Sequence, residues 1–199
     1  ANDILNGIQV EYEDLPPVLD IRDFDTVFFD YEYGKGDVDK AFADADKIYE
    51  EEFETGYQEQ AYLETQGMIA EPGADKMTVH GSMQCPYYVH GAVMRALGYS
   101  ASQVQIKQDV TGGGFGGKEA FPSILACQTA VAAKKAGRPV RVIFERREDM
   151  EFTSKRHPSL CKYKAAVKDG VVTAMDIDVL FNGGAYTTLS AVVLQRGII

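Results

Sequence analysis

Cysteine, basic charge and long apolar runs are all scarce in this chain of 199 residues. The three cysteines, Cys85, Cys127 and Cys161, lie far apart without metal-ligand spacing, which is typical of reduced thiols and not of a disulfide framework. No apolar run approaches the length of a membrane span, and the first residues lack the pattern of a signal peptide. We therefore expect a cytoplasmic protein with no membrane partner.

Basic residues are outnumbered, with 20 Lys and Arg against 30 Asp and Glu and a net charge of −10. The deficit is confined to residues 1–60, which hold 18 acidic and 4 basic residues, whereas residues 61–199 hold 12 and 16. General nucleic-acid binding needs a basic surface, so we expect no nucleic-acid partner. The mildly basic remainder could face an anionic ligand, although such an asymmetry is also typical of solvated surface.

Alternating apolar residues and turn signals are present throughout and predict an α+β fold. Strands are predicted at 8–21, 47–54, 61–71, 76–84, 102–110, 138–145, 160–168 and 171–182, and helices at 38–45, 85–97, 121–136 and 189–199. The two central helices each begin near a proline and end at a glycine. We expect them to cover one face of a mixed sheet in a two-layer arrangement.

A glycine-rich stretch, TGGGFGGKE at 111–119, lies between a predicted strand and a predicted helix. Gly112, Gly114 and Gly117 satisfy the pattern G-x-G-x-x-G, and the following lysine extends it to most of a kinase-type phosphate loop. Glycines let the backbone come close to a ligand and point several N–H groups at it, and the helix dipole adds partial positive charge. An electron-rich guest is therefore expected.

Three interpretations of this loop remain open from the residues alone. A kinase-type loop needs Ser or Thr after its lysine, where this chain has Glu119. A dinucleotide-binding loop fits the strand–loop–helix–strand context, with Glu145 as the ribose-binding acid, but the gap exceeds the usual spacing of roughly 20 residues. The loop could also be a tight structural turn in which Glu119 complements the helix dipole.

Four motifs taken together resemble the molybdenum-binding subunit of the xanthine dehydrogenase family. They are the glycine loop, YQEQAYLET at 57–65, GRPVRVIFERREDM at 137–150 and RHPSLCKYK at 156–164. The family also contains aldehyde oxidases and bacterial N-heterocycle hydroxylases. The resemblance covers nearly the whole chain and implies two parts: residues 1–30, the remnant of a preceding small hammerhead-like domain with its linker, and residues 31–199, the N-terminal part of the molybdenum-cofactor-binding domain.

The resemblance implies a molybdenum–molybdopterin cofactor whose metal takes no side-chain ligand from the protein. Gln84 matches a glutamine whose amide bonds a molybdenum oxygen, and Gly114, Phe115 and Gly116 match the loop that lies against the cofactor. Gln84 and Phe115 are thus expected near the metal without coordinating it. The alternatives are a surface glutamine at a strand end and a phenylalanine buried under the loop.

Glu119 matches a glutamate that contacts the heteroaromatic ring in purine-hydroxylating members, although it could instead be a plain helix N-terminal acid. Lys118 is expected to make only surface or anion contacts. The resemblance implies oxidative hydroxylation of a purine-like N-heterocycle of the xanthine/hypoxanthine class, with water as the oxygen source. An aldehyde or nicotinate-type hydroxylase of the same family, and a dinucleotide-binding module, are the alternatives.

The resemblance also implies that much of the machinery lies outside these residues. The family's general base, a glutamate, is expected C-terminal to this chain, so no catalytic residue is assigned within it. Cysteine clusters for iron–sulfur centres and flavin-binding motifs are absent from the sequence. Iron–sulfur clusters and FAD are therefore expected in partner chains or domains, and the chain is expected to be a fragment of the molybdenum subunit, inactive alone.

Overall fold

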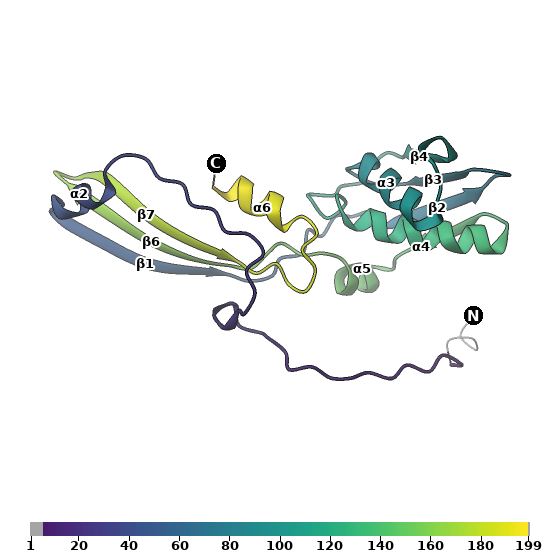
Figure 1. The fold of residues 1–199 in the computed structure, drawn as a ribbon, viewed down its shortest axis with the longest axis horizontal. Helices are drawn as coiled ribbons and strands as arrows, with labels where there is room; N and C mark the ends of the chain where they lie inside the picture. The colour runs from purple at the N-terminus through teal and green to yellow at the C-terminus, as the bar shows by residue number, and fades with distance from the viewer. Residues whose placement is uncertain (1–5, 199) are drawn as a thin grey trace.

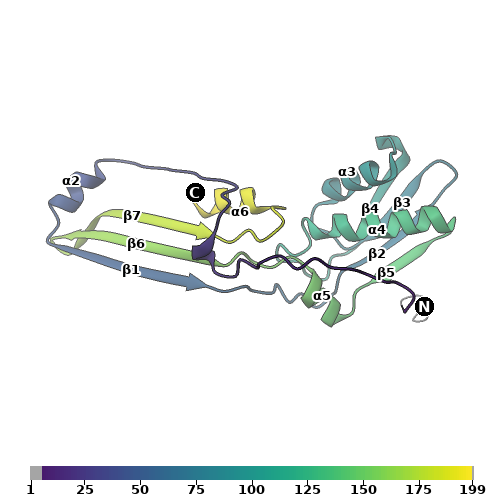
Figure 2. The same ribbon diagram turned by 60° about the horizontal axis from the view of Figure 1, so that its bottom comes forward.

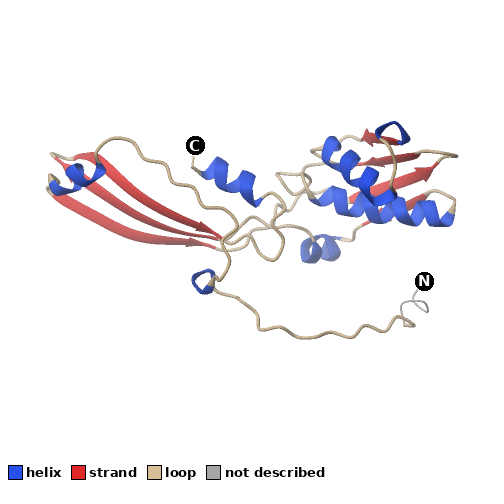
Figure 3. Ribbon diagram, in the orientation of Figure 1, coloured by secondary structure: helices blue, strands red, loops and turns tan. Residues whose placement is uncertain are grey.

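The computed structural model describes residues 6–198, and these form two lobes placed end to end along the long axis (Figure 1). One lobe, here called the α/β lobe, contains a four-stranded sheet with two helices. The other, the sheet lobe, contains three long strands and two short helices. Figure 3 shows that the strands of the two lobes form separate sheets.

The α/β lobe confirms the predicted mixed sheet. Its strands are β2 (Gly67–Pro72), β3 (Met77–Gly81), β4 (Val104–Gln108) and β5 (Val140–Ile143), in the order β4-β3-β2-β5. β3 runs parallel to β4, whereas β2 is antiparallel to both β3 and β5. A one-turn 3₁₀ helix, η2 (Ala101–Gln103), leads into β4.

Two helices cover one face of this sheet, as Figure 2 shows and as the sequence predicted. They are α3 (Pro86–Leu97) and α4 (Phe121–Ala136). Each has a proline in its first turn and ends at a glycine in the left-handed conformation, Gly98 or Gly137. Small residues on the inner face of α4, among them Ala126 and Ala130, are fully buried and let the helix approach the sheet closely.

The sheet lobe is an antiparallel sheet in the order β1-β6-β7. Its strands are β1 (Lys47–Thr55), β6 (Ser159–Lys168) and β7 (Val171–Phe181), and its helices are α2 (Val38–Ala43) and α6 (Ser190–Gly197). The predicted cap of α2 is confirmed, because the Asp37 side chain accepts from the backbone N–H of Lys40. The predicted hairpin is also present: Asp169 and Gly170 both have positive φ, as a tight I′ turn requires.

Two sequence predictions fail in the connecting segments. Residues 8–20 form no strand and are exposed, and only a single turn, η1 (Ile21–Asp23), follows them. No strand of the described residues pairs with this segment, and Pro16 and Pro17 remove two backbone donors. The charged run after β5 forms a helix that was not predicted, α5 (Arg146–Phe152). The proposed boundary at residue 30 stays a prediction, and its first five residues lie outside the described part.

Across residues 6–198, no helix combines the length and apolar character that crossing a bilayer requires. The three cysteines are all free thiols.

Candidate functional site

The glycine loop connects β4 to α4, and Gln84 follows β3, the parallel neighbour of β4. Because parallel neighbours end at the same edge of a sheet, the two segments meet there. The backbone N–H of Gln84 donates to the carbonyl oxygen of Lys118 over 2.7 Å. The sequence prediction that Gln84 lies beside the loop is therefore met.

Two hydrogen bonds to the loop fix the orientation of the Gln84 side-chain amide. Its Oε1 accepts from the backbone N–H of Gly116 at 3.0 Å and from that of Lys118 at 3.2 Å. A Cβ added at Gly114 would lie 2.5 Å from this oxygen, so only glycine permits the approach. With Oε1 engaged by the loop, the exposed Nε2 group remains available to donate outward.

Several loop amides are expected to point at a guest, and some of the others are bonded within the chain. The Gly112 N–H donates to Oε2 of Glu64 at 2.7 Å, and the Gly117 N–H donates to the carbonyl of Gly114 at 2.7 Å. Within residues 6–198, the N–H groups of Gly113, Gly114 and Phe115 have no acceptor. The usable donor set is therefore three consecutive amides together with Gln84 Nε2. A run of unengaged donors of this kind suits an oxygen- or sulfur-rich group.

Phe115 lies at the tip of the loop, with a φ of 51° and a side chain that is 77% exposed. The alternative that its ring is buried under the loop is therefore wrong. A positive φ at a bulky residue is strained, and it is held here by the neighbouring Gly114–Gly117 turn bond.

The expectation that Lys118 makes surface contacts is wrong, because its side chain is fully buried, whereas the alternative anion contact is present within the chain, to Glu64. Its Nζ donates to Oε2 of Glu64 at 2.8 Å and to Oγ of Ser82 at 3.1 Å, and it lies 4.7 Å from the centroid of the Tyr62 ring. Burial acts to raise the pKa of Glu64, but the hydrogen bonds from Lys118, Ser82 and Gly112 together lower this pKa below its ordinary value. Glu64 lies 54 residues from Lys118 in sequence, so the local sequence pattern around Lys118 does not indicate this ion pair.

Glu119 is half-buried just before α4, at the edge of the sheet that also holds Gln84. Burial raises the pKa of the Cys85 thiol, and the nearby Glu119 carboxylate raises it further. The structure therefore brings Glu119 close to the residue that follows Gln84. An open hollow of about 410 Å³ begins at the next residue, Ala120, and extends between α3 and the start of α4, where Tyr87, Arg95 and Phe121 line it among others.

Glu145, the acid required by the dinucleotide interpretation, is separated from the loop. It follows β5, which lies at the opposite edge of the sheet from β4 with two strands between them. A dinucleotide-binding unit places the strand that carries this acid beside the strand that precedes the glycine loop. The topology therefore disfavours that interpretation.

A buried polar network below the loop was not predicted. The Tyr62 hydroxyl donates to Oδ1 of Asp149 at 2.9 Å, and Nε2 of Gln66 donates both to that hydroxyl and to the Gly117 carbonyl at 2.9 Å. Burial, with the Asp149 carboxylate, raises the pKa of Tyr62 to about 12. Through Tyr62 and Asp149, the network ties the loop to residues 57–65 and 137–150, two of the motifs that carried the family resemblance.

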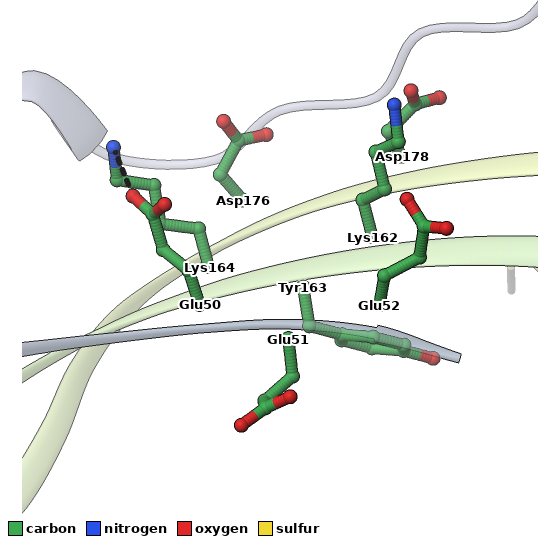
Figure 4. A pocket seen from close by; sticks show the side chains of 8 residues that line it. All are labelled: Glu50, Glu51, Glu52, Lys162, Tyr163, Lys164, Asp176 and Asp178. Atoms are coloured by element: carbon green, nitrogen blue, oxygen red, sulfur yellow. Dashed lines mark ion pairs between the residues drawn. The ribbon is translucent and has the colours of Figure 1, made fainter.

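A second hollow, of about 560 Å³, lies on the sheet lobe away from the loop. Figure 4 shows two rows of alternating charge across the strands, Glu50–Lys164–Asp176 and Glu52–Lys162–Asp178. Glu50 and Lys164 form an exposed ion pair at 2.9 Å. The opposite charges offset one another in water, which is typical of a solvated sheet face. Within residues 6–198, no group of three His, Cys, Asp or Glu is arranged to hold a metal ion.

Comparison with known proteins gives a consistent result. Residues 22–199 match the family described as the molybdopterin cofactor-binding domain. The chain is 38% identical to a xanthine dehydrogenase of Emericella nidulans over its whole length, which is 15% of that protein. It is 40% identical to aldehyde oxidase 1 of Bos taurus, with 96% of this chain and 15% of that protein covered.

Solved structures agree. The aldehyde oxidoreductase from Desulfovibrio gigas superposes with a TM-score of 0.71 at 27% identity, over 81% of this chain and 18% of that one. The fold of quinoline 2-oxidoreductase from Pseudomonas putida 86 matches with a TM-score of 0.79 at 24% identity, over 94% of this chain and 25% of that one. The chain therefore belongs to the molybdopterin cofactor-binding domain family of the xanthine dehydrogenases and aldehyde oxidases.

Proposed function

We propose that this chain supplies one wall of the molybdopterin site in a hydroxylase that oxidises a purine-like N-heterocycle of the xanthine/hypoxanthine class. In the balanced reaction, R–H and water give R–OH, two protons and two electrons. The observation that carries the proposal is that Gln84, bonded through its Oε1 to the loop, the three unengaged loop amides and Glu119 all lie at one edge of the sheet.

Each loop residue has its own part in holding the cofactor. Gln84 Nε2 and the N–H groups of Gly114 and Phe115 would donate to its oxygen and sulfur atoms, without side-chain coordination of the metal. The Gly116 N–H already donates to Oε1 of Gln84, and this bond would keep the Gln84 side chain oriented. When bound, the cofactor supplies the oxygen-transfer and two-electron redox chemistry. The electrons would pass to iron–sulfur clusters and FAD in other domains or chains, and the free thiols suit a reducing, cytoplasmic compartment.

Glu119 would act on the substrate. A carboxyl group at the start of α4 can bond a ring nitrogen and so orient the neighbouring carbon. An aldehyde has no ring nitrogen, and the similarity to aldehyde oxidases keeps an aldehyde substrate as the second candidate. The general base is expected elsewhere in the longer subunit, because the chain spans only about 15% of the curated relatives it matches.

The test uses Glu119→Ala and Glu119→Gln in the full-length enzyme, with xanthine and an aromatic aldehyde as substrates. We expect kcat/KM on xanthine to fall about 10²-fold in Glu119→Ala, with a change of less than about threefold on the aldehyde. Glu119→Gln should recover part of the loss, since an amide still bonds a ring nitrogen. Equal losses on both substrates would contradict the specificity role.

A further inference from the structure

Glu64 and Lys118 connect the two ends of the glycine loop. Glu64 bonds Gly112 twice: its Oε2 accepts the Gly112 N–H at 2.7 Å, and its own N–H donates to the Gly112 carbonyl at 3.3 Å. Lys118 bonds Gln84 twice through its backbone, at 2.7 and 3.2 Å. The 2.8 Å ion pair between the two side chains closes this circuit around residues 112–118.

The ammonium group of Lys118 has no donor left for a ligand. Two of its three hydrogens are directed to Glu64 and Ser82, and the Tyr62 ring lies over the group. It is also fully buried, which rules out direct contact with a guest in the open part of the loop. Lys118 therefore stabilises the conformation of the loop and does not bind the ligand.

We propose that Lys118 and Glu64 are positioning residues that hold the loop so that Gln84 Nε2 and the amides of Gly113–Phe115 face the same side. This inference rests on the proposed function for what the loop holds, but not for how the loop is held. Without the ion pair, the loop ends lose their common anchor and the donors no longer converge. Loading with molybdenum then falls, although neither residue touches the cofactor.

The experiment compares three variants of the full-length enzyme: Lys118→Met, the double variant Glu64→Leu/Lys118→Met, and Lys134→Met as a matched control. Lys134 lies near the far end of α4, where its Nζ donates to the Leu97 carbonyl at 3.2 Å and lies 4.4 Å from the Tyr99 ring centroid. The readouts are molybdenum per protomer by mass spectrometry, thermal midpoint, and amide hydrogen exchange of residues 111–119 in cofactor-free preparations from cells grown without molybdate.

In Lys118→Met we expect about tenfold less molybdenum and at least about tenfold faster exchange at the loop amides, with a lowered thermal midpoint. The double variant should recover part of the midpoint, because it also removes the Glu64 carboxylate, which is 42% exposed but would face the methionine without its cation. Its loop exchange should nevertheless stay fast and its molybdenum low. Lys134→Met should match the wild type in loop exchange and molybdenum.

Unchanged loop exchange in both Lys118 variants would overturn the inference, and so would recovery of loop protection together with the midpoint in the double variant. A wild-type enzyme that contains no molybdenum or pterin would instead overturn the proposed function. In that case faster loop exchange in Lys118→Met would still support the positioning role.

Discussion

The two lobes use their strands differently. In the α/β lobe, four of the five residues of β3 are buried, since α3 and α4 cover one face of its sheet. In the sheet lobe, all nine residues of β1 are exposed. One face of that sheet carries the charged rows, and the other leaves Tyr49, Phe53 and Ile177 about half exposed. A strand pattern thus specifies which residues share a face, whereas burial depends on a second layer. The α/β lobe contains that layer within this chain.

The largest expected contrast comes from truncating one apolar side chain in each lobe. Leu125→Ala, in the buried face of α4, should reduce the free energy of unfolding by about 2–5 kcal/mol, because it leaves a cavity in a closed core. Ile177→Ala, at an exposed position of β7, should cost less than about 1 kcal/mol. Urea denaturation of the wild type and both variants measures this, and equal losses would show that the sheet lobe has an equivalent core.

A smaller effect is expected from removing one hydroxyl group. Tyr62→Phe deprives Asp149 of a donor and Gln66 of an acceptor inside the buried network, so it should cost about 1–3 kcal/mol. Tyr49→Phe, on the exposed face of β1, is the matched control and should change stability by less than about 0.5 kcal/mol. If the two substitutions have equal effects on thermal and urea unfolding, the network under the loop contributes nothing.

The smallest effect is a dependence on pH. The pKa of Glu64 is lowered in the folded chain, so its contribution to stability is full above the ordinary value of 4.5 and is lost as pH falls through the folded-state pKa. The difference in unfolding free energy between the wild type and Glu64→Gln should therefore stay constant between about pH 8 and 6 and narrow below about pH 4.5. Glu50→Gln, in an exposed ion pair, should show little difference at any pH. If this difference in unfolding free energy instead increased as the pH was lowered, the pKa of Glu64 would be raised, not lowered, in the folded chain.

The sequence predicted the elements whose signals are local. Proline and glycine at helix ends and the Asp169–Gly170 turn depend on neighbouring residues or on one strand pair. The position of Gln84 beside the glycine loop was implied only by the family resemblance. The buried state of Lys118 was not predictable in this way, since its partner Glu64 is distant in sequence. The roles of Tyr62 and Asp149 were missed for the same reason. The sequence of α5 is a charged run, which is typical of solvated surface. Its one buried carboxylate, Asp149, is revealed only by the hydrogen bond from Tyr62, a residue of a distant segment.

The engaged oxygen of Gln84 has a consequence for selectivity. An amide side chain can normally rotate and present either its oxygen as an acceptor or its NH₂ group as a donor to a ligand. Here the chain itself occupies the lone pairs, so hydrogens alone point outward. Gln84 therefore favours a hydrogen-bond acceptor over a donor, and this preference is set by the loop before any ligand binds.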